Sequence, residues 1–116
     1  MTNPISADRF LPLHPLEFRV LMVLTKGASF GSEIVRRIEN AEGDRAELYP
    51  ANLFRRVRTL LSRDLLEECE APQGADPRRN YVRLTGLGRA VARAEALRLS
   101  ALVSDARAFE LLGADG

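Results

Sequence analysis

The amino-acid sequence predicts a mainly α-helical protein with one small β-hairpin, and three observations support this fold class. Between positions 15 and 63, apolar residues recur at the three- and four-residue spacing of amphipathic helices. A short alternating run, Tyr81 to Leu84, follows a loop rich in proline and glycine and suits a half-buried strand. From Thr85 to about Leu112, a long segment without proline has helical spacing again. Three helices, a hairpin and a long last helix are the layout of a winged helix-turn-helix with a C-terminal extension.

The chain of 116 residues is long enough for one domain with one hydrophobic core. We divide it into an N-terminal arm, residues 1–14, a winged helix-turn-helix domain, residues 15–84, and a C-terminal dimerisation helix with its tail, residues 85–116. The arm contains several apolar residues, so we expect it to pack on another surface, such as that of a partner subunit.

The three predicted helices have recognisable start and stop residues. Pro15 suits the first turn of the first helix, and Gly27 ends that helix. Ser29 is a plausible N-cap or turn residue for the second helix, Gly31 to Asn40. The third helix is expected from Pro50 to Arg63.

The functional prediction depends on the third of these helices. Its apolar stripe consists of Leu53, Val57, Leu60 and Leu61. We assign polar and cationic side chains to the opposite side, as candidates for contact with DNA: Asn52, Arg55, Arg56, Thr59 and Arg63. We expect Arg58 to lie off that face, where it is solvated or paired.

No acidic residue interrupts this helix, whereas an ordinary solvated face mixes charge signs because like charges four residues apart oppose the helix. A face of one sign therefore predicts an anionic partner. Phosphate is the first candidate, and Asn and Arg can also bond to base edges in a major groove. The alternative is a solvated cationic helix on a helical bundle.

A hairpin is expected after the third helix, with strands at Leu65 to Ala71 and Asn80 to Leu84. Arg78 and Arg79 lie near its tip, and we expect them to contact phosphate. The net charge of the chain is only +1, but the charge is segregated, because an acidic block separates these arginines from those of the helix.

The last predicted helix is longer than a small three-helix core can cover. We expect its distal half, from about Leu97, to pack against another subunit. The candidate dimerisation residues on its apolar band are Leu97, Leu102, Phe109 and Leu112. The alternative is a helix that folds back over its own domain.

The sequence argues against an enzyme, a cofactor or a metal site. His14 and Cys69 are the only histidine and the only cysteine, so neither a metal cluster nor a Ser–His or Cys–His pair can be recognised. One cysteine permits no internal disulfide, which fits a reducing compartment. Met1 to Ser6 has neither the basic start nor the apolar run of a signal peptide, so we expect a cytoplasmic protein.

Three motifs together resemble the PadR family of bacterial winged-helix transcriptional regulators. Gly31 to Ile34 is similar to the Gly-Tyr-Glu-Ile that begins the second helix of that family. Asn52 to Leu65 is similar to its Leu-Tyr-x-x-Leu-x-x-Leu recognition helix. Val82 to Arg89 is similar to its Tyr-x-Leu-Thr-x-x-Gly-Arg junction between wing and final helix. The resemblance covers about residues 13–93, and the ordered set is far more specific than any one motif.

The chain also departs from the family pattern at four positions. Ser32, Phe54 and Val82 replace tyrosines, and Asp64 stands where a helix-ending glycine is usual. Phe54 keeps a ring but lacks the hydroxyl that could bond to a phosphate. Asp tolerates the left-handed conformation better than most residues, so the turn is expected to survive.

The resemblance implies a homodimeric repressor of the smaller subgroup, with one C-terminal dimerisation helix. Its recognition helices would enter successive major grooves of double-stranded DNA, and its wings would touch flanking phosphate or minor groove. The resemblance also implies a small aromatic or cationic hydrophobic effector bound between subunits. The alternatives are a winged-helix module that binds an acidic protein partner and an architectural protein that ignores DNA sequence.

Overall fold

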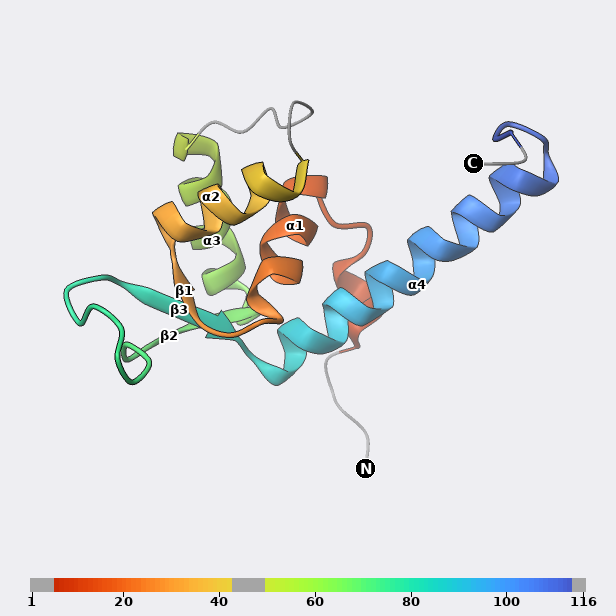
Figure 1. Ribbon diagram of the computed structural model, residues 1–116. Helices are drawn as coiled ribbons and strands as arrows, with labels where there is room; N and C mark the ends of the chain where they lie inside the picture. Colours follow the sequence, from red (N-terminus) through yellow and green to blue (C-terminus); the bar gives the residue numbers. More distant parts are fainter. Residues whose placement is uncertain (1–5, 43–49, 114–116) are drawn as a thin grey trace.

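Three helices pack around a common core, a small sheet extends from them as a wing, and a fourth helix projects away as a rod (Figure 1). The computed structural model describes residues 6–42 and 50–113. In chain order its elements are the 3-10 helix η1 (Ala7–Phe10), α1 (Pro15–Leu24), β1 (Ser29–Phe30), α2 (Gly31–Glu42), α3 (Pro50–Ser62), β2 (Leu66–Cys69), β3 (Tyr81–Leu84) and α4 (Gly86–Ala108). The predicted fold class, mainly helical with a small sheet and a long last helix, is confirmed.

The hydrophobic core joins all three helices of the body to the sheet and to the first half of α4. Its buried apolar residues include Val20, Leu21, Leu24, Ile34, Ile38, Leu53, Leu60, Leu65, Leu66, Val82 and Val91. Burial of each such side chain contributes about 1.5–3 kcal/mol to folding. Because α3 contributes Leu53 and Leu60 to this core, its opposite side is held at the surface.

The start of α1 is fixed by a capping box. The Nδ1 atom of His14 accepts a hydrogen bond from the backbone N–H of Leu16 at 3.1 Å, and the Glu17 carboxylate accepts one from the backbone N–H of His14 at 3.3 Å. These bonds satisfy backbone donors that have no partner within the helix. The single histidine of the chain is thus a helix cap.

The predicted hairpin is part of a three-stranded antiparallel sheet with the order β1-β3-β2. β2 pairs with β3 as expected, from Leu66 opposite Leu84 to Cys69 opposite Tyr81. Ser29 was expected to be an N-cap or turn residue of the second helix. Instead, Ser29 and Phe30 pair with β3 as the third strand. A strand of two residues is too short for its side-chain alternation to be visible in the sequence.

Tight backbone contacts fix the junction between the wing and α4. Asp64 adopts the left-handed conformation expected for it, with φ 61°. The Thr85 side chain donates a hydrogen bond to the Asp64 carbonyl at 2.6 Å and accepts one from the Gly88 N–H at 2.9 Å. A Cβ atom at Gly88 would lie 1.9 Å from the Leu65 carbonyl oxygen, so only glycine fits without movement of the backbone.

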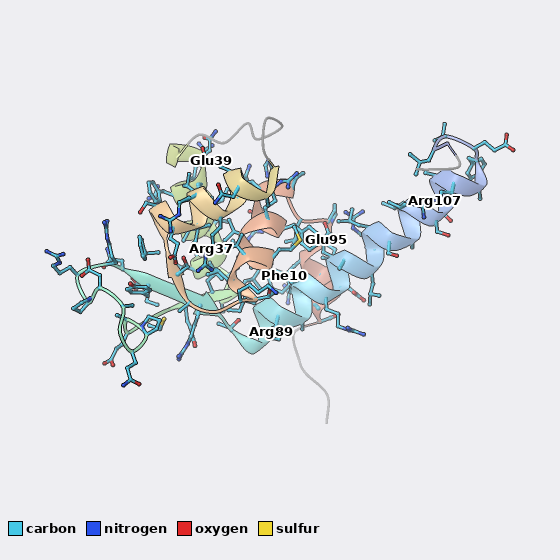
Figure 2. The ribbon with its side chains drawn as sticks, in the orientation of Figure 1. Phe10, Arg37, Glu39, Arg89, Glu95 and Arg107 are labelled. Atoms are coloured by element: carbon cyan, nitrogen blue, oxygen red, sulfur yellow. The ribbon has the colours of Figure 1, made fainter. Side chains whose placement is uncertain are left out.

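The described part of the N-terminal arm packs on α4 of its own chain. η1 lies against this helix, with Phe10 partly buried, and the backbone N–H of Leu13 donates to the Glu95 carboxylate at 3.1 Å (Figure 2). Glu95 is itself buried, and the guanidinium of Arg98 donates to it at 2.5 and 2.9 Å. α4 ends at Ala108, four residues before the predicted end at Leu112.

Candidate nucleic-acid interface

The exposed side of α3 carries Arg55 and Arg58, and both side chains reach solvent. With about 100° of rotation per residue, Arg55 lies about 175° and Arg58 about 115° from the middle of the apolar stripe. Neither guanidinium pairs with a carboxylate in the described part of the chain. The two arginines therefore provide uncompensated positive charge on the outer face of this helix.

Arg56 does not share that face, which corrects the arrangement predicted for it. It lies only about 85° from the middle of the apolar stripe, and its side chain is half-buried. Its Nη1 atom lies 3.4 Å from the carboxylate of Glu17, a buried residue of α1. Arg56 thus ties α3 to α1 and offers little free charge to a ligand.

Arg58 was expected off the basic face, and the structure instead places it where α3 meets the wing. It lines a groove of about 470 Å³ between α3, the start of α2 and the sheet. The other residues that line this groove are Phe30, Gly31, Ser32, Phe54, Val57, Leu61, Glu68, Arg78, Arg79, Asn80 and Val82. The helical geometry of α3 could have identified Arg58, because it is further from the apolar stripe than Arg56.

The remaining predicted residues of α3 lie near the surface and bond locally. The Oδ1 atom of Asn52 accepts a hydrogen bond from the Arg55 guanidinium at 2.9 Å, so the two side chains form one polar unit. The hydroxyl of Thr59 donates to the Arg55 carbonyl at 3.1 Å. Arg63 lies just beyond the end of the helix and is exposed.

The wing contributes Arg78 and Arg79, which share one acidic neighbour. The guanidinium of Arg78 donates to both carboxylate oxygens of Asp76, at 3.1 and 3.3 Å. These hydrogen bonds, with one from the Arg78 backbone N–H, lower the pKa of the Asp76 carboxyl. Asp76 therefore stays charged and compensates part of the positive charge at the wing tip.

Arg79 is held mainly by an aromatic ring. Its guanidinium carbon lies 5.0 Å from the ring centroid of Phe30, and its Nε atom is 4.0 Å from Asp76. The Phe30 ring packs edge-to-face against Tyr81, with the centroids 5.3 Å apart. This stack holds the Arg79 guanidinium over Phe30, on the border of the groove that also contains Arg58.

A second surface is apolar and comprises the distal half of α4 and the residues that follow this helix. The four predicted dimerisation residues are all exposed: Leu97 by 59%, Leu102 by 50%, Phe109 by 80% and Leu112 by 38%. Figure 1 shows this part of the helix extending beyond the body of the molecule. Exposed large apolar side chains that gather on one segment are typical of a surface that a partner covers.

The described residues show neither a metal site nor a membrane helix. They contain no group of three or more His, Cys, Asp or Glu side chains that could hold a metal ion. Among them, no helix combines the length and the apolarity that a membrane span requires.

The family model for the transcriptional regulator PadR-like family matches residues 20–94, well over half of the chain. The chain belongs to the PadR-like family. Its members are transcriptional regulators that bind DNA and typically dimerise, and such regulators are generally not enzymes. The matched segment contains every predicted DNA-binding residue, from α3 to the wing.

Solved structures with the same fold include regulators of this family. A PadR family transcription regulator from Clostridium difficile superposes with a TM-score of 0.71 at 17% identity, over 83% of this chain and 98% of that one. A transcriptional regulator from Clostridium thermocellum gives a TM-score of 0.71 at 19% identity, over 90% and 97% of the two chains. At this identity, these matches establish the fold alone.

RosR from H. salinarum is more similar in sequence. In the complex structure of hsRosR-S1, it gives a TM-score of 0.63 at 29% identity, over 90% of this chain and 88% of that one. No curated protein matches this PadR-like chain significantly.

Proposed function

We propose that this PadR-like protein is a homodimeric transcriptional repressor whose α3 helices enter successive major grooves of an operator. The observation that carries the proposal is the outer face of α3, where Arg55 and Arg58 are exposed without a carboxylate partner among the described residues. Such a face attracts phosphate, and a guanidinium can make paired hydrogen bonds to guanine.

Individual roles follow from position. Arg55 and its hydrogen-bonded neighbour Asn52 lie in the first half of α3, where base edges would be reached, and Thr59 lies one turn further on. Arg63 lies beyond the helix end and would contact phosphate. Arg56 supports the orientation of α3 through Glu17 and plays a smaller part in DNA contact than the sequence suggested.

The wing would follow the sugar-phosphate backbone beside the major groove. Arg79, oriented on Phe30, and Arg58 border the same groove in the protein, so they would contact phosphates on either side of one backbone segment. Arg78 would contact phosphate by exchanging its bond to Asp76, which is exposed and therefore weak.

The two-fold arrangement would come from α4. In this proposal, residues 15–84 form the DNA-binding domain, and residues 85–116 supply the dimerisation helix, whose first half also completes the core. The exposed Leu97 and Leu102 support an interface along the distal part of α4. A small aromatic or cationic hydrophobic effector bound between subunits would change the spacing of the two α3 helices and release the DNA.

A genomic pull-down of bound DNA, followed by sequencing, tests the proposal. We expect the wild type to recover a small set of sites with a shared two-fold motif, and Arg55→Ala/Arg58→Ala to lose them. Arg93→Ala, which removes an exposed arginine from α4, is the matched control and should recover the same sites. Equal recovery by the double variant would contradict this reading surface, and recovery of an acidic protein without DNA would favour the protein-interaction module.

A further inference from the structure

The face of the molecule formed by α1 and α2 has a groove that the proposed DNA contact does not use. Its volume is about 360 Å³, and its floor is apolar, with Met22 and Val23 from α1 and Ile38 and Ala41 from α2. Its border is cationic and consists of Arg19, Lys26 and Arg37. Of these, Arg37 pairs with Glu33 at 3.5 Å, and Arg19 also has an interaction partner, so the charge argument depends on Lys26. An apolar floor with a positive border fits an apolar segment that carries acidic side chains.

This groove continues toward α4. A neighbouring groove of about 320 Å³ lies between α1 and α4 and shares Arg19 and Met22 with the first. Phe18 and Leu99 add apolar surface to it. The two grooves together form one strip, which begins at the middle of α4, where the exposed dimerisation residues start, and ends on α2.

The C-terminal segment of the chain has the complementary chemistry. Phe109 is 80% exposed and Leu111 is 78% exposed, and nothing in the described part of the chain covers them. Glu110 lies between them and Asp105 lies before them, and both carboxylates are exposed. Arg107 lies between these two carboxylates and has an interaction partner of its own. The segment therefore presents large apolar side chains together with two carboxylates and one arginine, a net charge of −1.

A two-fold dimer through α4 would bring this segment to the strip. α4 has 23 residues, which corresponds to a rod of about 35 Å. In a two-fold pair the contact is reciprocal, so an antiparallel partner helix that crosses near Leu99 directs its C-terminal end back over the first subunit. That end would then lie beside α1 and α2 rather than in solvent.

We infer that the partner subunit's C-terminal segment, the equivalent of residues 105–112, docks in the α1–α2 groove. Its apolar side chains cover Met22 and Ala41, and its carboxylates face the cationic border that includes Lys26. This inference rests on the proposed homodimer and adds a second contact to the α4 pair. It also places the dimer contact on α2, the helix that precedes α3, so subunit association would influence the orientation of the reading helix.

Disulfide trapping tests the contact directly. Cys69 is the only cysteine, so Cys69→Ser gives a background without thiols. In this background, a tagged Leu111→Cys chain is mixed with an untagged Met22→Cys chain and oxidised gently, and the products are separated by mass. We expect a disulfide that joins Cys at position 111 of the tagged chain to Cys at position 22 of the untagged chain. Both positions are exposed, so the substitutions should not disturb folding.

The control replaces Met22→Cys by Glu39→Cys, which lies elsewhere on α2 (Figure 2). This chain should form no disulfide with the Leu111→Cys chain.

Light scattering on the same samples separates the two proposals. A dimer that forms no 22–111 disulfide overturns the docking site and leaves the homodimer intact. A dimer that forms it no faster than the Glu39→Cys control also overturns the docking site. A monomer at micromolar concentration overturns the homodimer and the docking site together.

Charge reversal provides an independent measurement. We expect Lys26→Glu to raise the dimer Kd by roughly threefold to tenfold, because two equivalent contacts each lose one exposed charge pair. Adding Glu110→Lys to the same chain should restore the Kd. Arg63→Glu makes the same charge change away from the groove and should leave the Kd unchanged. No rescue by Glu110→Lys would contradict the assigned charge contact.

Discussion

Arg56 and Arg58 are two positions apart on one helix, yet their surroundings give them different roles. Arg56 is close enough to the apolar stripe to meet the buried carboxylate of Glu17. Arg58 lies further round the helix and reaches solvent beside the wing. Removing one partner of a buried ion pair leaves an uncompensated charge, so we expect Arg56 to act on stability more than on DNA contact.

Exchanging these two arginines for alanine separates the roles. We expect Arg58→Ala to weaken binding to operator DNA and to reduce the slope of log K against log salt by about 0.9, because one phosphate contact is lost. Arg56→Ala should instead lower the free energy of unfolding by about 1–3 kcal/mol, because the buried Glu17 loses its charged partner. Fluorescence anisotropy over a salt series and urea denaturation measure the two effects. The opposite pattern would contradict the assignment.

Glu95 gives the stability of the chain a dependence on pH. The hydrogen bonds from Arg98, aided by the Leu13 N–H, lower the pKa of the Glu95 carboxyl from its ordinary value of 4.5. A lowered pKa in the folded state stabilises the protein fully above the unfolded value, and this stabilisation is lost as the pH falls through the lower folded value.

Glu95→Gln should therefore lower the free energy of unfolding at pH 7 by about 1–3 kcal/mol. The variant should also lose part of the acid-dependent destabilisation that we expect of the wild type below about pH 4.5. Urea denaturation of the wild type and of Glu95→Gln at pH 7 and pH 3 measures the difference in their free energies of unfolding. A difference between the chains that is as large at pH 3 as at pH 7 would contradict the role of the carboxylate charge.

At the scale of elements, the helices and the hairpin could be predicted because their side-chain periodicity is local. The start of α1 at Pro15 and the left-handed Asp64 were also readable, because caps and turns depend on a few adjacent residues. β1 could not be predicted, since its two residues become a strand only by pairing with β3 across the fold. The end of α4 was placed too late because Phe109 to Leu112 keep the apolar spacing beyond the last helical turn.

Two glycines lie at the junction between the wing and α4, and we expect only Gly88, not Gly86, to be needed there for stability. We expect Gly88→Ala to lower the free energy of unfolding by about 1–3 kcal/mol, because its Cβ would collide with the Leu65 carbonyl oxygen. Gly86→Ala is the matched control, since a Cβ there meets no atom within 4 Å. Thermal denaturation of both variants checks this. Equal Tm values for the two would show that the junction can shift to accept a side chain.

At the scale of the whole molecule, the resemblance of short motifs correctly indicated the PadR-like family and the winged-helix fold. The groove between α3 and the wing could not be predicted, because it brings together Arg58 from α3, Phe30 from β1 and Arg79 from the loop before β3. The same holds for the contact of the arm with Glu95, which is 82 positions from Leu13. Sequence patterns identify faces of elements, and only the packed fold shows which faces meet.

The most direct test of the account is a hydroxyl-radical footprint on an operator recovered from the genome. The account predicts two protected half-sites about 10 base pairs apart, centre to centre, as a two-fold pair of α3 helices requires. It also predicts that Arg55→Ala/Arg58→Ala abolishes the protection while Arg93→Ala retains it. A single protected segment, or protection that survives the loss of Arg55 and Arg58, would contradict it.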